Sequence, residues 1–516
     1  MTVSAFWALV LAVLAGVAAQ LSPIDATAPT LENGFSPPIA PAPSLQNSFS
    51  PPIAPAPSLQ NSFSPPIEPS RVIGISRLPL VQRPRLGQST NNIPVTSERQ
   101  FSYSIRLTFG TQAFDLCFDT GSSDVWVVSS SCSDPDCEAV PQYDASLLQF
   151  ANLNGKFNLN YLMGFAEGGI ASTNIQMGPF MVESQVFALV DKTSQLDLAS
   201  TGTSGIAGFA FPATAAISPT IGATFFQNLI SALEADNQFM AFHLSRSDSG
   251  SSDPNASLTL GILDPAFASD PSALAYSAVI RTGPEYDYWK LPMLGMIVNG
   301  SPFQISSSRI PGATMPIAVL DSGTTLILGS AADVRALYAL FGSAVRYLNG
   351  NYLVRCTFAA VISLVLGDKR VPYPIHPSDI AWQESESDGW CTGGIQPNDN
   401  VCNGDWLLGD VFLRNVYVVQ NASGPTIGLR SVTDPVSALA QFRAERGPDV
   451  EGSDDDGVLA GMDGNNNNWN MATGFVKRWE REPAGVDTYV FGLIAGGAGF
   501  VVGSLGVLGW RIWRGV

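Results

Sequence analysis

The same short pattern occurs twice in this chain. "LCFDTGSSDVW" (116–126) and "AVLDSGTTLIL" (318–328) each place an apolar run before an aspartate, and a glycine with hydroxyl residues after it. A carboxylate at the end of a buried strand is costly unless another group pairs with it. The duplication therefore predicts two related halves that bring Asp119 and Asp321 face to face at a pseudo-twofold axis.

The apolar runs around these motifs are short and are interrupted by glycine, proline, serine and asparagine, as in "FSYSIRLTFGTQAFDLCFD". Runs of this kind are typical of many short β-strands rather than long helices. They continue from about residue 98 to residue 432, and the chain of 516 residues is long enough for two or more cores. We therefore expect an all-β protein over 98–432.

The formal net charge of −18 argues against nucleic acid as a partner. Carboxylates that repel one another at neutral pH become neutral in acid, so the composition suits an acidic medium. The same charge can also serve solubility alone.

The sequence offers few catalytic groups other than carboxylates. The chain has only two histidines, His243 and His376; neither lies in a ligand motif, and no G-x-S-x-G sequence frames a serine. No cysteine and histidine cluster has zinc spacing, and no glycine-rich phosphate loop opens a helix. We expect no metal and no cofactor, which leaves a pair of carboxylates as the catalytic group.

Two carboxyl groups that face each other cannot both ionise easily, so we expect them to share one proton. The ionised oxygen can take a proton from a trapped water molecule while the protonated partner polarises a carbonyl group. A glycine after each aspartate lets backbone N–H groups come close, and a hydroxyl group next to it can orient the carboxylate. These supporting residues are Gly121 and Ser122 in the first motif, and Gly323 and Thr324 in the second.

With these motifs, the chain resembles the pepsin-like (A1) aspartic endopeptidases, and among them fungal members tethered to a membrane or cell wall. The family also carries an apolar-apolar-Gly segment downstream of each aspartate, which residues 206–208 and 407–409 supply here. The resemblance implies a bilobal fold with pseudo-twofold lobes, 98–273 and 274–432, and a central cleft. It also implies a monomer that cleaves polypeptides at acidic pH.

The resemblance also places a flap over the cleft. Tyr161 in "YLMGFAEGGIASTNIQMG" corresponds to the flap tyrosine, whose hydroxyl group meets Trp126, although a tyrosine at a strand end can also be part of the core. The residues that follow it, Leu162, Met163 and Phe165, are more apolar than is usual in the family. An apolar flap favours apolar substrate side chains near the scissile bond.

The six cysteines agree with the resemblance. It implies one disulfide between Cys132 and Cys137 and a second between Cys356 and Cys391. Cys117 lies two residues before Asp119, so strand alternation puts both side chains on one face. The family position of Cys117 lines the pocket for the residue before the scissile bond, although it can also be a plain buried thiol. Cys402 has no partner in the family pattern.

The N-terminal segments indicate secretion and a proenzyme. Residues 1–19 have an apolar run and a small-residue end typical of a signal peptide; a membrane anchor is the alternative. Residues 20–97 contain a proline-rich repeat of period 14 and then a basic stretch, which the resemblance interprets as a prosegment. Secretion also makes three sequons candidate glycosylation sites: Asn255, Asn299 and Asn421.

The C-terminal segments indicate a tether. We expect an acidic, disordered linker over 433–489, a transmembrane helix over 490–510 and a cytoplasmic tail over 511–516. Arginines follow the span and acidic residues precede it, which predicts a single-pass type I protein with its catalytic part on the extracytoplasmic side. The membrane is that of the cell surface or of a vacuole or endosome. A GPI signal is the alternative.

Two other functions fit parts of the sequence. A catalytically silent pepsin-like binding or inhibitor protein would explain the unusual flap, although both aspartates and both glycines are present. A cell-wall structural protein would rest on the proline-rich repeat at 33–66 and predicts that this repeat matters more than 98–432.

Overall fold

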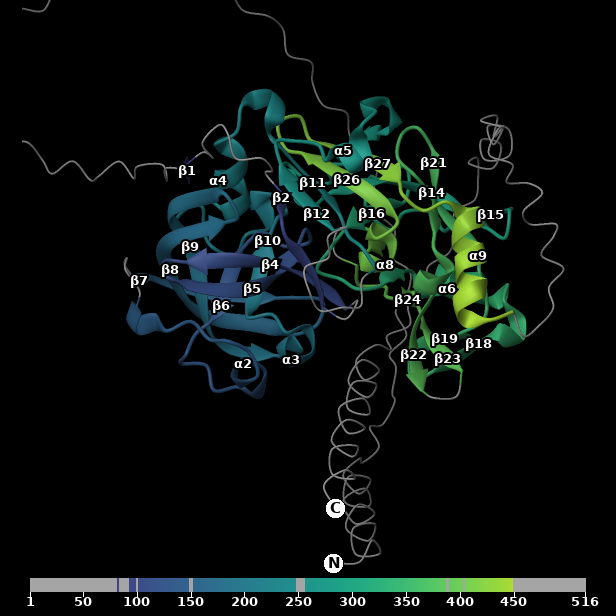
Figure 1. Cartoon of the computed structure of the whole chain (residues 1–516), viewed down its shortest axis with the longest axis horizontal. Coiled ribbons are helices and arrows are strands. Elements are labelled where there is room, and N and C mark those ends of the chain that lie inside the picture. The colour runs from purple at the N-terminus through teal and green to yellow at the C-terminus, as the bar shows by residue number, and fades with distance from the viewer. Residues whose placement is uncertain are drawn as a thin grey trace, which may run out of the picture. The chain divides into compact units, whose positions relative to one another are not determined.

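β-strands are the dominant regular structure of the computed structural model (Figure 1). It describes residues 81–82, 92–98, 101–147, 152–246, 256–386, 389–401 and 404–448. The chain divides into two units, 1–75 and 76–516, and every described residue belongs to the second. The short strands and few helices agree with the all-β prediction.

The first aspartate motif belongs to a nine-stranded sheet in the order β1-β9-β6-β10-β5-β4-β8-β7, with β3 paired to β4. Its strands are β1 (Val81–Gln82), β3 (Val95–Glu98), β4 (Ser102–Phe109), β5 (Gln112–Asp119), β6 (Val125–Val128), β7 (Asn152–Asn160), β8 (Phe165–Met177), β9 (Phe180–Ser194) and β10 (Gly205–Gly208). The short β1 lies within the expected prosegment and pairs antiparallel with β9.

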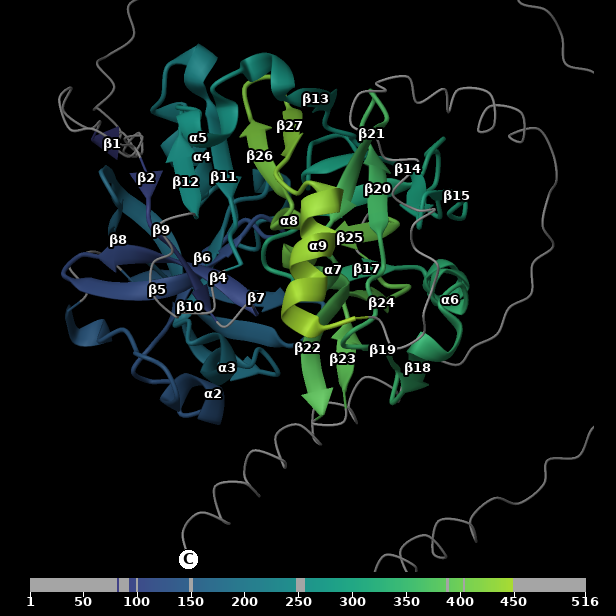
Figure 2. The same cartoon turned by 45° about the vertical axis from the view of Figure 1, so that its right-hand side comes forward.

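The second motif belongs to an eight-stranded sheet in the order β21-β20-β14-β16-β25-β17-β24, with β15 paired to β14. Its strands are β14 (Lys290–Val298), β15 (Ser301–Phe303), β16 (Ile317–Leu320), β17 (Ile327–Gly329), β20 (Ile362–Leu366), β21 (Val371–Ile375), β24 (Ile395–Pro397) and β25 (Trp406–Leu408). In both views these green strands lie apart from the purple and blue strands of the first sheet (Figures 1 and 2).

A six-stranded sheet joins the two halves in the order β13-β27-β26-β11-β12-β2. Its strands are β2 (Asn92–Ile93), β11 (Phe239–His243), β12 (Ser257–Leu260), β13 (Ala275–Ala278), β26 (Val416–Asn421) and β27 (Thr426–Ser431). Strands from both predicted lobes pair here, because β11 lies between β12 and β26. One buried hydrophobic cluster includes residues from both motif-bearing sheets and from this one.

A four-stranded sheet, in the order β18-β19-β23-β22, extends the second half. Its strands are β18 (Val345–Leu348), β19 (Asn351–Arg355), β22 (Ala381–Glu386) and β23 (Trp390–Gly393). In the view of Figure 1 this sheet forms the lower part of the C-terminal half.

The described helices are short, and they connect strands or cover sheets. They are α2 (Pro135–Glu138), α3 (Leu198–Thr201), α4 (Phe225–Ser231), α5 (Pro265–Ala268), α6 (Ala331–Ala339), α7 (Pro377–Ile380), α8 (Asp410–Leu413) and α9 (Pro435–Arg446). None of the helices in these described ranges is both long enough and apolar enough to cross a membrane. The signal peptide and the span predicted over 490–510 lie outside the described residues.

Helix α9 corrects the prediction of a disordered linker that starts at residue 433. The Asp434 carboxylate caps the helix by accepting from the Ser437 N–H at 2.8 Å, and Pro435 occupies the first turn. Leu439 and Phe442 are buried in the hydrophobic cluster that also includes residues of both motif-bearing sheets. The disorder prediction rested on the acidic composition of 433–489 as a whole and did not consider these apolar positions. It was wrong for this part of the segment.

Candidate active site

Each aspartate lies at the end of a strand whose neighbour comes from further along the same half. Strand β10 runs parallel to β5 and pairs Gly208 with Asp119. Strand β25 runs parallel to β16 and pairs Leu408 with Leu320, the residue before Asp321. The two apolar-apolar-Gly segments thus flank the two aspartates in the same way, as the family resemblance implied.

The two loops approach so closely that each glycine faces the carboxyl group of the opposite loop. A Cβ atom on Gly121 would lie 2.7 Å from one carboxylate oxygen of Asp321 and closer still to the other. A Cβ atom on Gly323 would lie 2.6 Å from the carboxyl carbon of Asp119. Only glycine leaves room for both carboxyls, because side-chain carbons do not approach other heavy atoms this closely.

Backbone and hydroxyl donors orient each carboxylate. The Gly121 N–H donates to Asp119 Oδ1 at 2.7 Å, and the Gly323 N–H donates to Asp321 Oδ1 at 2.9 Å. The other oxygens accept from hydroxyl groups: Asp119 from Ser122, and Asp321 from Thr324 at 2.8 Å. All four residues predicted to support the pair therefore contact it.

Two further hydroxyl residues, which the sequence analysis did not single out, connect the loops. The Thr120 hydroxyl donates to the Leu320 carbonyl at 3.1 Å, and the Ser322 hydroxyl donates to the Phe118 carbonyl at 2.7 Å. Each also accepts from the other's backbone N–H at 3.1 Å. The signal was present, because the residue between Asp and Gly carries a hydroxyl group in both motifs.

Burial and mutual proximity favour protons on this pair. Burial raises the pKa of Asp119, and the neighbouring Asp321 carboxylate raises it further. Burial also raises the pKa of Asp321, against the hydrogen bonds from Thr324 and Gly323. The protons leave in steps that belong to the pair as a whole. The pair can therefore keep one shared proton at pH values well above the usual pKa range of carboxyl groups.

The hairpin of β7 and β8 carries Tyr161 at its turn. The Trp126 Nε1–H group donates to the Tyr161 hydroxyl at 2.6 Å, which is the contact that the resemblance implied. The Tyr161 N–H donates to the Gly164 carbonyl at 3.0 Å and closes the turn. Between them, Leu162 and Met163 are 40% and 52% exposed, so the apolar tip is not packed into the core.

Residues 102–432 match the family pattern of the eukaryotic aspartyl proteases. The chain belongs to this family. It is therefore an aspartic-type endopeptidase, a hydrolase that acts on polypeptides.

Individual relatives agree with this assignment. The chain is 30% identical over 330 residues to an aspartic protease of Phaffia rhodozyma, covering 62% of this chain and 74% of the relative. It is 28% identical over 356 residues to major aspartyl peptidase 1 of Cryptococcus neoformans, covering 66% and 70%. It is 26% identical over 344 residues to embryonic pepsinogen of Gallus gallus, covering 65% and 82%.

Cys117 is a buried free thiol on the strand that ends at Asp119. Burial raises its pKa well above the ordinary range, and the nearby Asp119 carboxylate adds to the shift. The thiol therefore stays protonated and contributes as a small apolar group. Cys402, the other cysteine without a partner in the family pattern, lies outside the described residues.

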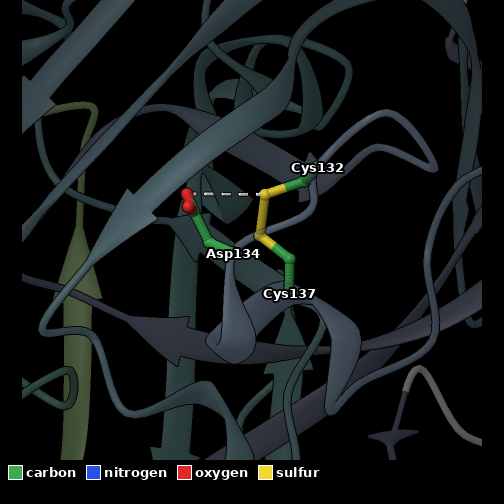
Figure 3. Close-up of side chains that lie close together, drawn as sticks. All are labelled: Cys132, Asp134 and Cys137. Carbon is green, nitrogen blue, oxygen red and sulfur yellow. Dashed lines mark hydrogen bonds between the residues drawn. A yellow bond between two sulfur atoms is a disulfide. The ribbon is translucent and has the colours of Figure 1, made fainter.

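This aspartyl protease has the two disulfides that the resemblance implied, Cys132–Cys137 and Cys356–Cys391. Figure 3 shows Asp134 beside the first, with Cys132 Sγ 3.9 Å from its Oδ2 atom. The ligand atoms of these three side chains lie within 4.8 Å of one another, as in a metal site. Because the two sulfurs are bonded to each other, they cannot serve as thiolate ligands.

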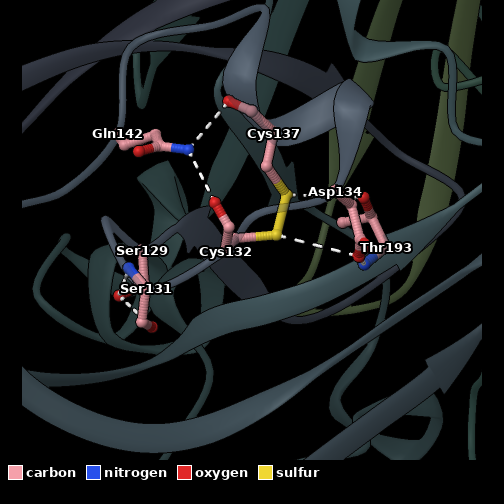
Figure 4. The surroundings of a disulfide bond; sticks show 7 residues. All are labelled: Ser129, Ser131, Cys132, Asp134, Cys137, Gln142 and Thr193. Atoms are coloured by element: carbon pink, nitrogen blue, oxygen red, sulfur yellow. Dashed lines mark hydrogen bonds between the residues drawn. A yellow bond between two sulfur atoms is a disulfide. The ribbon is translucent and has the colours of Figure 1, made fainter.

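Hydrogen bonds around this disulfide tie its loop to the sheet (Figure 4). The Gln142 amide donates to the carbonyls of Cys132 and Cys137 at 3.0 and 3.1 Å. The Thr193 N–H of β9 donates to Asp134 Oδ2 at 2.8 Å. The disulfide loop thus has a structural role next to the first half of the active site.

Two of the three candidate glycosylation sites lie at turns. Asn299 is exposed between β14 and β15, and its Oδ1 atom accepts from the Val361 N–H at 3.1 Å. Asn421 ends β26, and its Oδ1 atom accepts from the Ser423 N–H at 2.9 Å. Both contacts use the oxygen and not the nitrogen to which a glycan is attached. Asn255 lies outside the described residues.

Asp410 is a buried carboxyl beside the active site and was not predicted from the sequence. Its side chain is fully buried in α8, and neither of its oxygens has a hydrogen-bond partner among the described residues. Burial raises its pKa well above the usual range, while the Arg414 guanidinium opposes the shift. A folded-state pKa above the unfolded value means that protonation favours the fold.

We therefore expect Asp410 to make the protein less stable as the pH rises. Its contribution is complete below the unfolded carboxyl pKa of about 4 and is lost as the pH approaches the raised folded value. Asp410→Asn, which stays neutral, should flatten the fall in Tm between acidic and neutral pH, measured by calorimetry across a pH series. If the parent and the variant lose Tm in parallel, Asp410 does not titrate in this range.

Proposed function

We propose that Asp119 and Asp321 form a catalytic dyad that hydrolyses peptide bonds through an activated water molecule. The observation that carries the proposal is the approach of the two carboxyls, each of which occupies the space that a Cβ atom on the opposite glycine would need. Two acids at this spacing share one proton, which supplies a base and an acid in one site.

The chemical steps follow from this shared proton. The ionised carboxyl takes a proton from water as the water oxygen attacks the carbonyl carbon, and the protonated carboxyl gives its proton to the carbonyl oxygen. In the next step the protonated carboxyl donates to the leaving nitrogen while its partner takes a proton from a hydroxyl group of the intermediate. The C–N bond breaks, and the dyad again holds one proton.

Substrates with apolar side chains near the scissile bond fit the flap best. The exposed Leu162 and Met163 give the tip apolar surface that a bound substrate can contact. Burying such a side chain against a substrate removes apolar area from water, which favours binding. Although the side chains at the tip are apolar, the backbone of the turn can still form hydrogen bonds with a substrate.

A direct activity assay separates this function from a silent binding protein. The purified full chain should cleave members of a peptide library in acid and should be inhibited by a pepstatin-type transition-state analogue. If it cleaves no peptide at any acidic pH and does not bind the analogue, a catalytically silent binding or inhibitor protein is the better description.

The enzyme is made, in this proposal, as a zymogen whose basic segment covers the cleft at neutral pH. Arg71, Arg77, Arg83 and Arg85 precede an acidic catalytic part, and β1 in this segment pairs with β9. Acid protonates the carboxylates that pair with such a segment, and the segment leaves the cleft because these ion pairs are lost. A basic linker without a regulatory role is the alternative.

We expect acid treatment to produce a new N-terminus between Arg85 and Gln100, read by N-terminal sequencing. A cut before Asn92 would keep β2 in the six-stranded sheet. Replacing the four arginines by glutamine should raise activity at neutral pH. An unprocessed parent chain that is fully active at neutral pH would contradict this account.

The predicted span at 490–510 would tether the enzyme to a membrane of the secretory pathway, with the catalytic part on the extracytoplasmic side. Lys477 and Arg478 precede that span in polar sequence and form a dibasic pair suited to processing. They can instead be only part of a charged stretch of stalk.

If the pair is a processing site, cells should release a soluble form that ends near residue 478. Replacing Lys477 and Arg478 together by alanine should abolish that form, measured by immunoblot and mass spectrometry of the medium. Arg481→Ala is the matched control and should leave release unchanged. Equal release from the double variant and the parent would show that another site, or none, is cut.

A further inference from the structure

Trp382 lies at an interruption in the four-stranded sheet. The ladder between β22 and β23 pairs Ala381 with Gly393 and Gln383 with Thr392, which leaves Trp382 as the extra residue of a β-bulge. Bulges redirect a side chain and occur often beside active sites. Here the indole ring meets Phe101 of the first half, with ring centroids 5.1 Å apart and planes at 87°.

Phe101 lies next to the dyad. It precedes β4, which pairs antiparallel with β5 up to Ser104 opposite Cys117, so the start of β4 lies at the end of β5 that carries Asp119. The Thr325 hydroxyl, four residues after Asp321, donates to the Phe101 carbonyl. The aromatic pair therefore borders both aspartate loops.

One side chain of this pair is accessible to a ligand, and the other has an unmatched hydrogen-bond donor. Phe101 is 36% exposed, so its ring can be contacted from outside. Trp382 is 7% exposed, and its Nε1–H group has no acceptor among the described residues. Buried polar groups nearly always have a hydrogen-bond partner, so an unmatched donor this near the aspartate loops indicates an acceptor that arrives with the ligand.

We propose that Phe101 and Trp382 form an aromatic subsite for the extended peptide substrate. An apolar or aromatic substrate side chain packs on the exposed Phe101 ring and turns it aside, and a substrate backbone carbonyl then accepts from Trp382 Nε1. A neutral carbonyl fits better than a carboxylate, because the dyad and the net charge of −18 repel anions. The inference rests on the proposed catalytic dyad.

The expected signature is a change in binding rather than in chemistry. A contact with a remote part of the substrate that is equally strong in the ground and transition states changes KM and leaves kcat unaltered. The KM for a short peptide that does not reach the pair should be unaffected when the pair is lost. This dependence on substrate length distinguishes a subsite from a packing role.

The test compares Trp382→Phe, which keeps a ring and removes the N–H group, with Trp390→Phe as the matched control in the adjacent strand. For long peptides, Trp382→Phe should raise KM about three- to tenfold with kcat unchanged, as expected for one hydrogen bond. Short peptides and the control should show parent values. Phe101→Leu should weaken the preference for aromatic substrate residues. If Trp382→Phe does not fold, Phe101→Leu serves as the test variant in its place.

The proposal is overturned if Trp382→Phe and Phe101→Leu keep parent KM values for long and short peptides alike, even where their Tm falls. The parent chain is assayed first, so a parent that cleaves nothing contradicts the proposed function instead. In that case calorimetric binding of the long peptides tests the subsite by itself. Binding that is as tight in Trp382→Phe as in Trp390→Phe would overturn it.

Discussion

Replacing Asp119 or Asp321 by asparagine should lower kcat/KM by roughly 10³-fold or more, since it removes the acid–base pair on which the proposed chemistry depends. The fold should persist, because asparagine has nearly the same shape and the amide can keep most contacts with Gly121 and Gly323. Peptide hydrolysis and circular dichroism on the same samples measure the two effects.

Asp115→Asn is the matched control for this loss. Asp115 lies on the same strand as Asp119 and pairs with Arg106 at 2.9 Å, but the Arg106 and Asp115 side chains are 63% and 44% exposed. An exposed ion pair contributes little, so this variant should keep parent activity. Substantial hydrolysis by either dyad variant would mean that other groups activate the water.

Gly121→Ala should be almost as damaging as loss of a carboxyl. The added Cβ atom would lie 2.7 Å or less from both carboxylate oxygens of Asp321, and the two loops must separate to admit it. A displacement of about 1 Å in a catalytic group can cost roughly 10²-fold in rate, so we expect a loss of at least this size in kcat.

Gly283→Ala provides the comparison, because a Cβ atom there would meet nothing within 4 Å. It should keep parent kcat and KM. If Gly121→Ala retains near-parent kcat, the two carboxyls are not held as close as the structure has them, and the proton-sharing account loses its geometric basis.

The duplicated motif was enough to predict the centre of the site from the sequence. A carboxylate, a glycine and a hydroxyl group at fixed offsets in both halves require similar local structures, and the structure brings both together. The contact between Tyr161 and Trp126 and the two disulfides were predicted from the family resemblance, since the residue pattern alone does not say which of these side chains meet.

Features that depend on how strands pair and pack in the folded protein could not be predicted from the sequence. Nothing in Asn92–Ile93 indicates that this strand joins a sheet with β12. The β-bulge at Trp382 depends on the registry between two strands, which a run of residues does not encode locally. The buried Asp410 looked like one more acidic residue in an acidic chain, because burial is a property of the fold.

Helix α9 shows how composition misleads at a domain boundary. Residues 433–489 are acidic and rich in glycine and asparagine as a whole, so their average favours disorder. The first part nevertheless has a capping aspartate, a proline and apolar residues at helical spacing. A shorter window would have detected these signals.

The pH dependence of kcat/KM for the purified chain tests the shared proton most directly. Both carboxyls have raised pKa values, so the singly protonated pair should persist well above the usual carboxyl range and disappear as the pH rises further. We predict a profile with its maximum in acid that falls at low pH, where both carboxyls are protonated, and falls again when the shared proton is lost. A profile that is flat, or that rises steadily into alkaline pH, would contradict a dyad that works with one proton.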